Sequence, residues 1–150
     1  MELTLIRHAI AEDGDDDFAR PLSGRGRKRF TAEVARLETM GVRFERVLHS
    51  PLTRAVQTAE LLRPLTDGLE ETPLLAKAPT RALLEACSGE RVALVGHEPH
   101  LSALLAWLVL GDAAEGGRFE LKKGAVAVLD GAPRPGAMRL IALLTPKALR

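Results

Sequence analysis

The chain has 150 residues, a length that predicts one domain spanning residues 1–150. Its hydrophobic content of 46% is enough for a sizeable core, and its formal net charge is +1. This balance gives the chain no general attraction for nucleic acid or for a membrane surface, so any anion has to be bound by a local group of charges.

Near the N-terminus, a short strand is followed by a loop and a helix. Residues 3–7 form a nearly continuous apolar run that ends on an arginine and predicts a buried strand. The acidic stretch 11–18 contains glycine and clustered aspartates, which predicts a solvated loop. Ser23 is a candidate N-cap for a helix over 23–40, in which apolar residues recur at spacings of three and four.

The next part of the chain repeats this order. Residues 46–50 predict a second short strand. A helix follows that starts at Pro51, where proline suits the first turn, and stops at Pro64. A short extended segment near Pro73–Leu75 is a candidate third strand.

The last part of the chain contains the clearest strand, at 91–97, between helices expected at 80–86 and 99–110. Two final strands are expected at 125–130 and 138–144. Strands that alternate with helices are typical of the α/β class. The sequence therefore predicts a three-layer sandwich, in which helices cover both faces of a mostly parallel central sheet.

Cysteine use and hydropathy bear on the compartment. Cys87 is the only cysteine, so no intramolecular disulfide can form, which fits a reducing compartment. We interpret it as a small packed hydrophobic residue rather than a catalytic thiol. No apolar run reaches the roughly 18 residues of a membrane span, and Arg7 interrupts the first run too early for a signal peptide. We therefore expect a cytoplasmic protein without a membrane segment.

Arginines and histidines follow three of the predicted strands. The first strand ends on Arg7 and His8, the helix after the second strand carries Arg54 in its first turn, and the strand at 91–97 ends on His97. Ligands of open α/β sheets bind beyond the carboxyl ends of the strands. These four side chains are therefore expected to meet in one crevice.

The four side chains suit phosphoryl transfer. Two arginine forks can bind the non-bridging oxygens of a phosphate group, and a neutral imidazole can accept a phosphoryl group on nitrogen. A second histidine can stabilise the charge that develops during transfer. The helix that begins after His97 adds backbone N–H groups and the positive end of its dipole.

Three motifs resemble those of the histidine phosphatase superfamily, the phosphoglycerate mutase-like proteins: LIRHA, SPLTRAVQTAE and VGHEPHL. The family's Arg-His-Gly hallmark reads Arg7-His8-Ala9 here, where alanine takes the place of a small residue and leaves the two functional residues intact. The short chain and the stretch RPLSGRGR, residues 20–27, are most similar to SixA-type phosphohistidine phosphatases.

The resemblance implies a phosphoglycerate mutase-like fold and a role for each matching residue. His8 would be the nucleophile and would form a phosphohistidine intermediate that water hydrolyses. Arg7 and Arg54 would bind the phosphoryl oxygens, and His97 would stabilise the transition state. Arg20, the arginine of RPL, and Glu98, which follows His97, are further expected substrate-binding residues.

The sequence departs from larger members of the family in two respects. It lacks the long insertions that roof their active sites, so we expect an open site that suits a phosphorylated protein surface. It also has Lys77 near the place of an acidic residue, with Glu71 and Glu85 as the nearest carboxylates, so the general acid is not assigned. Phosphohistidine has a good leaving group once its imidazole is protonated, and an enzyme specialised for it could lack a dedicated acid.

We therefore expect a phosphatase that uses no metal or cofactor and acts on a phosphohistidine protein, such as a histidine phosphotransfer domain. A general phosphatase of small phosphate esters is the alternative enzyme, and a non-catalytic phosphoprotein-binding module is the alternative of another class. His97 and His100 are three residues apart, unlike the pair of a zinc helix, and no third ligand is evident. The oligomeric state stays open.

Overall fold

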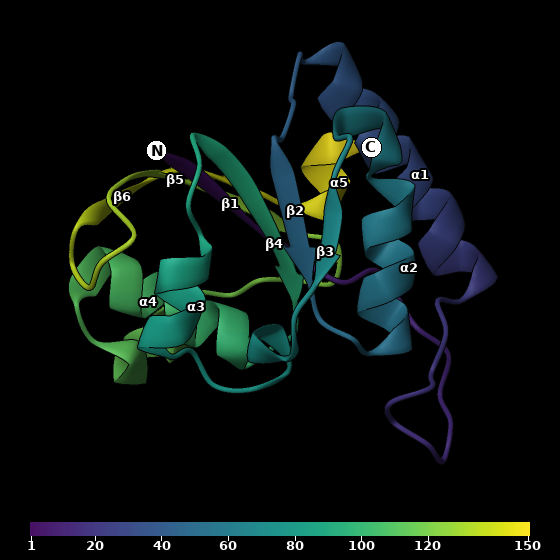
Figure 1. Ribbon diagram of the computed structural model, residues 1–150. Coiled ribbons are helices and arrows are strands. Elements are labelled where there is room, and N and C mark those ends of the chain that lie inside the picture. Colours follow the sequence, from purple (N-terminus) through teal and green to yellow (C-terminus); the bar gives the residue numbers. More distant parts are fainter.

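A six-stranded sheet forms the middle of the molecule in the computed structural model, which describes residues 1–150 (Figure 1). The strand order is β3-β2-β4-β1-β5-β6, and the first four strands in this order run parallel while β5 and β6 are antiparallel to their neighbours. The strands are β1 (Glu2–Arg7), β2 (Arg46–His49), β3 (Leu69–Glu71), β4 (Arg91–Gly96), β5 (Val126–Gly131) and β6 (Met138–Leu144).

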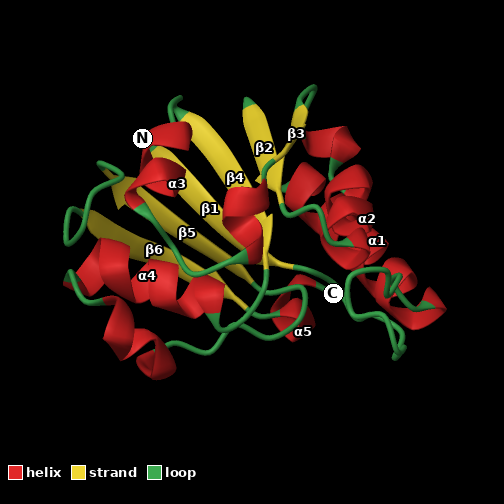
Figure 2. Cartoon of the chain, turned by 60° about the horizontal axis from the view of Figure 1, so that its bottom comes forward, coloured by secondary structure: helices red, strands yellow, loops and turns green.

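Helices cover both faces of this sheet, with α1, α2 and α5 on one face and α3 and α4 on the other (Figure 1, Figure 2). The α-helices are α1 (Gly24–Thr39), α2 (Thr53–Leu61), α3 (Arg81–Ala86), α4 (His100–Leu110) and α5 (Pro146–Leu149). Three 3₁₀ helices, η1 (Arg63–Leu65), η2 (Pro73–Ala76) and η3 (Ala113–Arg118), complete the fold. The predicted three-layer α/β sandwich without a large insertion is confirmed.

The two faces of the sheet bury two separate cores, because successive side chains of a strand point to opposite faces. Leu3 and Leu5 of β1 pack with α3 and α4, whereas Ile6 packs with α1 and α2. In β4, Leu94 belongs to the first core and Val95 to the second. The central strands are therefore apolar throughout, as expected for strands buried on both faces.

Local signals explain where several helices begin. The Ser23 hydroxyl accepts a hydrogen bond from the Gly26 N–H at 2.9 Å and caps α1, as predicted. The Thr80 hydroxyl caps α3 in the same way. The helix expected from Pro51 begins at Thr53 instead, because the Leu52 N–H is bonded to the Ser50 hydroxyl and Leu52 stays extended.

The predicted third strand at Pro73–Leu75 is wrong. The strand is β3, Leu69–Glu71, which pairs with β2 so that Glu71 lies opposite His49. Pro73 opens η2 instead, since proline lacks the N–H that a strand would donate and its fixed φ suits a first helical turn. None of the helices has both the length and the apolar character needed to cross a membrane.

Candidate active site

The strand ends bring His8 and His97 together at one edge of the sheet. The parallel pairing of β1 and β4 places Arg7 opposite Gly96, and the His8 N–H donates to the Gly96 carbonyl at 3.1 Å. The residue that follows β4 is His97, whose ring centroid lies 5.2 Å from that of His8. Both imidazoles are buried. Because each histidine directly follows one of two paired strands, the strand pairing brings their rings together.

His8 is neutral and has one fixed tautomer. Its Nδ1 lies 2.7 Å from the Ala9 carbonyl, which can only accept, so Nδ1 carries the proton and Nε2 keeps its lone pair. Burial, with smaller contributions from His97, Arg54 and Arg7, lowers the pKa of His8 to about 3, although the bond to Ala9 acts in the opposite direction. His8 therefore offers an unprotonated nitrogen at neutral pH.

His97 is held by a residue that sequence reasoning did not assign to the site. Its Nε2 lies 2.7 Å from the hydroxyl of Ser50, which is fully buried and also accepts from the Leu52 N–H at 3.2 Å. Burial first, then the charge of Arg54, lowers the pKa of His97 to about 4. Its other nitrogen, Nδ1, is buried without a hydrogen-bond partner in the protein.

Arg54, which is buried, and Arg7, which is half-buried, bring two cations to the same place. Arg54 is 6% exposed and donates from Nη1 to the Asp17 carbonyl at 2.7 Å, and Arg7 donates from Nη1 to the Leu121 carbonyl at 2.9 Å. The Nε atoms of both arginines are buried without a partner. Burial, with Arg54 adding to it and Glu98 opposing it, lowers the pKa of Arg7. Positive charge that the protein satisfies only in part favours an anionic ligand.

Thr58 links the His8 segment to the helix that carries Arg54. Its Oγ1 accepts from the Ala9 N–H at 3.0 Å and donates to the Arg54 carbonyl at 2.7 Å. Its side chain is fully buried, so it also contributes to the packing of α2. Its position four residues after Arg54 on α2 is the signal that could have placed it near the site.

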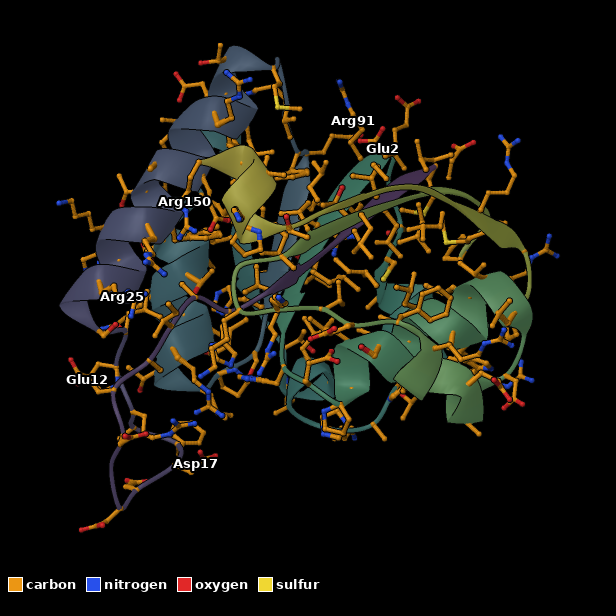
Figure 3. All side chains as sticks on the ribbon, turned by 180° about the vertical axis from the view of Figure 1, so that it is seen from behind. Glu2, Glu12, Asp17, Arg25, Arg91 and Arg150 are labelled. Atoms are coloured by element: carbon orange, nitrogen blue, oxygen red, sulfur yellow. The ribbon has the colours of Figure 1, made fainter.

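Asp17 is the second residue that the sequence did not assign to the site. The stretch 11–18 forms a loop, as expected, and Figure 3 shows Asp17 on its protruding part. The Asp17 carboxylate, although 72% exposed, lies 3.4 Å from Arg54 Nη2. The charge of Arg54 is the main reason why the pKa of Asp17 is lowered. The loop is therefore tied to the site and is not merely solvated.

Arg20 and Glu98 make contacts outside the group around His8. Arg20 donates from Nε to Asp17 at 3.1 Å and from Nη1 to the Glu12 carbonyl, so it reaches Arg54 only through Asp17. Glu98 accepts from the Ser102 N–H at 2.9 Å and from the Ser102 hydroxyl, which places its carboxylate at the start of α4. Their substrate-binding roles stay predictions.

Cys87 and His49 are both held by the packing and hydrogen bonds of the fold, away from the group around His8. Cys87 is buried in the core beside α3, where burial raises the pKa of its thiol to about 11, so it is poorly suited to nucleophilic attack. His49 is buried and its Nδ1 lies 3.0 Å from the Ser50 carbonyl. No group of three or more histidine, cysteine, aspartate or glutamate side chains is arranged to hold a metal ion.

Comparison with known proteins places this geometry in a family. The model of the histidine phosphatase superfamily (branch 1) matches residues 3–78. An uncharacterized protein of Picosynechococcus sp. is 35% identical over 99% of this chain and 99% of its own length. The structure of the protein histidine phosphatase SixA complexed with tungstate has a TM-score of 0.83 at 25% identity and covers 100% of both chains.

A phosphoserine phosphatase of Entamoeba histolytica, solved with 3-phosphoglyceric acid, has the same fold. Its TM-score is 0.78 at 14% identity over 99% of both chains. Proteins that share this fold are thus named as a protein histidine phosphatase and as a phosphoserine phosphatase. The family match over half of the chain and the full-length relative together show that the protein belongs to the histidine phosphatase superfamily.

Proposed function

We propose that the protein is a metal-independent phosphatase in which His8 Nε2 attacks the phosphorus atom of the substrate. The observation that carries this proposal is the fixed, neutral tautomer of His8 beside the buried Arg54 and the half-buried Arg7. The Ala9 carbonyl holds the proton on Nδ1, so the lone pair of Nε2 is available without a general base.

The reaction has two steps. In the first, the Nε2–P bond forms, the bond between phosphorus and the leaving group breaks, and the leaving group departs with its electron pair. In the second, water attacks the phosphorus atom, the Nε2–P bond breaks, and inorganic phosphate leaves while Nε2 recovers its lone pair. The proton released by water neutralises the basic leaving group or enters solvent, so the net reaction is hydrolysis.

The other three residues stabilise the charge on the transferring phosphoryl group. Arg7 and Arg54 have unpartnered Nε atoms that are available for its equatorial oxygens. The Ser50 hydroxyl accepts from Leu52 N–H and shares a hydrogen bond with His97 Nε2. We assign the hydroxyl as the donor in that bond, which leaves the proton of His97 on Nδ1, the nitrogen without a partner. That N–H becomes a donor to the same phosphoryl group. Such preorganised donors act most strongly on charge that grows in the transition state.

Phosphohistidine on a protein is the substrate class that we propose. The chain has no large insertion over the sheet edge, and its fold is that of SixA, which is named as a protein histidine phosphatase. No carboxylate is hydrogen-bonded to His8 or His97. Asp17, the acid paired with Arg54, has a lowered pKa and is therefore a poor proton donor. A phosphoramidate, whose imidazole leaves in the protonated form, needs such a donor least.

A general phosphatase of small phosphate esters is the rival, because the Entamoeba phosphoserine phosphatase has the same fold. A phosphoprotein-binding module without turnover is the rival of another class. The neutral state of His8 argues against such a binding module, since binding alone does not require an unprotonated nitrogen at this position.

Release of phosphate from a phosphohistidine phosphotransfer domain and from p-nitrophenyl phosphate, measured side by side with EDTA present, tests the proposal. We expect much faster release from the phosphohistidine protein and no release by the His8→Ala variant. Comparable rates for both substrates would favour the general phosphatase. Release from neither substrate would favour the binding module, and release that EDTA abolishes would contradict a metal-independent reaction.

A further inference from the structure

A second basic site lies beside the segment that carries His8. A cavity of about 630 Å³ opens between α1, α5 and the segment before β5, and both Arg7 and Ala9 line it. Cavities of this size are typical of small-molecule sites. Apart from Arg7, the basic residues that line it are Arg29, Lys122, Lys123, Lys147 and Arg150.

These five cations form no ion pair within the protein. None of them takes part in any of the molecule's ion pairs. Desolvation, followed by the charges of Arg25 and Arg150, lowers the pKa of Arg29, which indicates that these guanidinium groups repel one another. Figure 3 shows Arg150 at the end of α5 beside α1, the helix that also carries Arg25. Positive charge concentrated in this way attracts an anion.

Glu33 adds an independent observation. It lines the same cavity from α1, its side chain is 2% exposed, and its carboxyl group has neither a hydrogen bond nor an ion pair. A Cβ atom at Gly124 would lie 3.0 Å from Glu33 Oε1, so the carboxyl group packs closely against the segment before β5. A buried polar group without a partner is costly unless a ligand satisfies it.

We propose that this cavity binds a small polyanion, such as a molecule with several phosphate groups, through its five lysine and arginine side chains and the buried Glu33 carboxyl group. Glycine at 124 leaves room for the Glu33 carboxyl group, and the small residue Ala9 lines the cavity one residue after His8. The site does not depend on the reaction assigned to His8, because none of the five cations belongs to the group around that residue.

Protonation of Glu33 strengthens this binding. Burial raises its pKa to about 7, although the charge of Arg150 acts in the opposite direction. Below that pH the neutral carboxyl group donates a hydrogen bond to an anion, whereas above it the carboxylate repels the anion. The charged groups that line the cavity with Glu33 are Arg7 at the strand end, Arg29 of α1, Lys122 and Lys123, and Lys147 and Arg150 of α5. Polyanion binding is therefore expected to weaken as pH rises through 7.

Calorimetric titration with inorganic tripolyphosphate at low salt tests the site. The Arg29→Ala/Lys147→Ala variant removes two lining cations, and the Arg36→Ala/Arg91→Ala variant is its matched control, since both of those arginines are exposed and neither lines the cavity. We expect binding to weaken about tenfold or more in the first variant and to change less than about twofold in the control. Amide NMR shifts should locate the ligand at residues 122–124 and 147–150.

Equal losses in both double variants would overturn the proposal, because they would show attraction to net charge alone. Amide shifts confined to Arg54 and its neighbours would overturn it too, since the ligand would then occupy only the site around His8. In Glu33→Gln, the affinity for tripolyphosphate still changes with pH because tripolyphosphate itself ionises, but the part of the change that is due to Glu33 is lost. Identical pH profiles for Glu33→Gln and the unmodified protein would remove Glu33 from the site.

Kinetics distinguish the two sources of such an anion. If the bound anion is a second anionic group of the substrate, Arg29→Ala/Lys147→Ala raises the KM of a substrate with two phosphate groups. The KM of p-nitrophenyl phosphate, which has one phosphate group, then stays unchanged. If it is a separate ligand, tripolyphosphate binds equally well with substrate present and both KM values stay unchanged. Either result supports a specific anion-binding site, and the two results distinguish a substrate group from a separate ligand.

Discussion

At the scale of single residues, the low proton affinity of His8 is the property on which the chemistry depends. An unperturbed histidine, with a pKa near 6.5, would be largely protonated at pH 5. Burial brings the pKa of His8 to about 3 and that of His97 to about 4. Protonation removes the lone pair of Nε2, so turnover is expected to fall only when the pH approaches these values.

The pH dependence of kcat/KM therefore carries a prediction. After correction for the ionisation of the substrate, followed by ³¹P NMR, the acidic limb that belongs to the free enzyme should lie at about pH 4 or below. A limb near pH 6.5 would show that the histidine that limits turnover is not desolvated, and would contradict the assignment of a buried neutral nucleophile.

Thr58 carries a second prediction at this scale. Thr58→Val keeps the shape of the side chain but leaves the Ala9 N–H without its acceptor, which costs about 1–3 kcal/mol of stability. Because Ala9 holds His8, we expect kcat to fall about tenfold with little change in KM. Thr58→Ser, which restores the hydroxyl, is the matched control. Unchanged kcat in Thr58→Val would leave Thr58 with a purely structural role.

The sequence predicted the residues that follow strands and missed those that reach the site across space. Arg7, His8 and His97 could be placed together because parallel strands end at a common edge. Asp17 and Ser50 could not, since the contact of each with its partner depends on how a loop or a turn folds back on α2 or β4. Nothing in the acidic run distinguishes Asp17 from its neighbours.

At the scale of elements, the packing of α1 against the segment after β1 holds the chain close to His8. The Ile10 carbonyl accepts from the Ser23 N–H at 3.0 Å, and the Gly26 backbone approaches it so closely that a Cβ there would lie 2.0 Å from the oxygen. Only glycine allows this approach. The N-terminus of α1 therefore holds the chain two residues after His8.

Gly26→Ala tests this contact. Helix propensity alone would favour alanine by about 1 kcal/mol, but the clash with a backbone oxygen should destabilise the protein by about 2 kcal/mol or more. Gly24→Ala is the matched control, because nothing lies within 4 Å of a Cβ at that position. Urea unfolding of both variants measures the difference. Equal stabilities would show that the Ile10 segment moves freely and does not constrain His8.

Most elements could be predicted because their signals are local. The caps at Ser23 and Thr80 and the apolar runs of β1 and β4 specify structure with little help from the rest of the chain. The short strand β3 could not be predicted, since Leu69–Glu71 is largely polar and its extended structure depends on hydrogen bonding to β2. Pro73 favours the start of a helical turn, and this preference outweighed the preference of the apolar residues after it for a strand.

At the scale of the whole molecule, Glu33 makes stability depend on pH. Its pKa is about 7 in the folded state and about 4.5 in the unfolded chain, so the folded state binds more protons between these values. Its contribution is complete below about pH 4.5 and is lost as pH rises through 7. The loss amounts to about 1–3 kcal/mol once screening by water and by the nearby cations is allowed for.

Glu33→Gln should remove this dependence. The difference in unfolding free energy, Glu33→Gln minus the unmodified protein, is expected to be about 1–3 kcal/mol larger at pH 8 than at pH 4, so that the variant is relatively more stable at the higher pH. Any constant cost of burying the amide cancels in this comparison, as do the histidines that both proteins share. A relative stability that is the same at both pH values would show that Glu33 ionises normally.

The basic cavity is also a property of the whole molecule. Its cations lie near both ends of the chain, at Arg29, at Lys122 and Lys123, and in α5, so no local stretch of sequence predicts that they meet. Arginine and lysine are common on surfaces, and only the fold shows that these particular ones share a cavity.

Covalent catalysis by His8 is tested most directly by trapping the phosphorylated protein. Rapid quenching in alkali during turnover of a phosphohistidine substrate with EDTA present, followed by peptide mass spectrometry, detects a phosphoryl group on histidine. We predict one phosphoryl group per chain, on His8, formed and lost at rates compatible with turnover and absent from His8→Asn. Turnover without any phosphorylated protein, or with the phosphoryl group on another residue, would contradict the account.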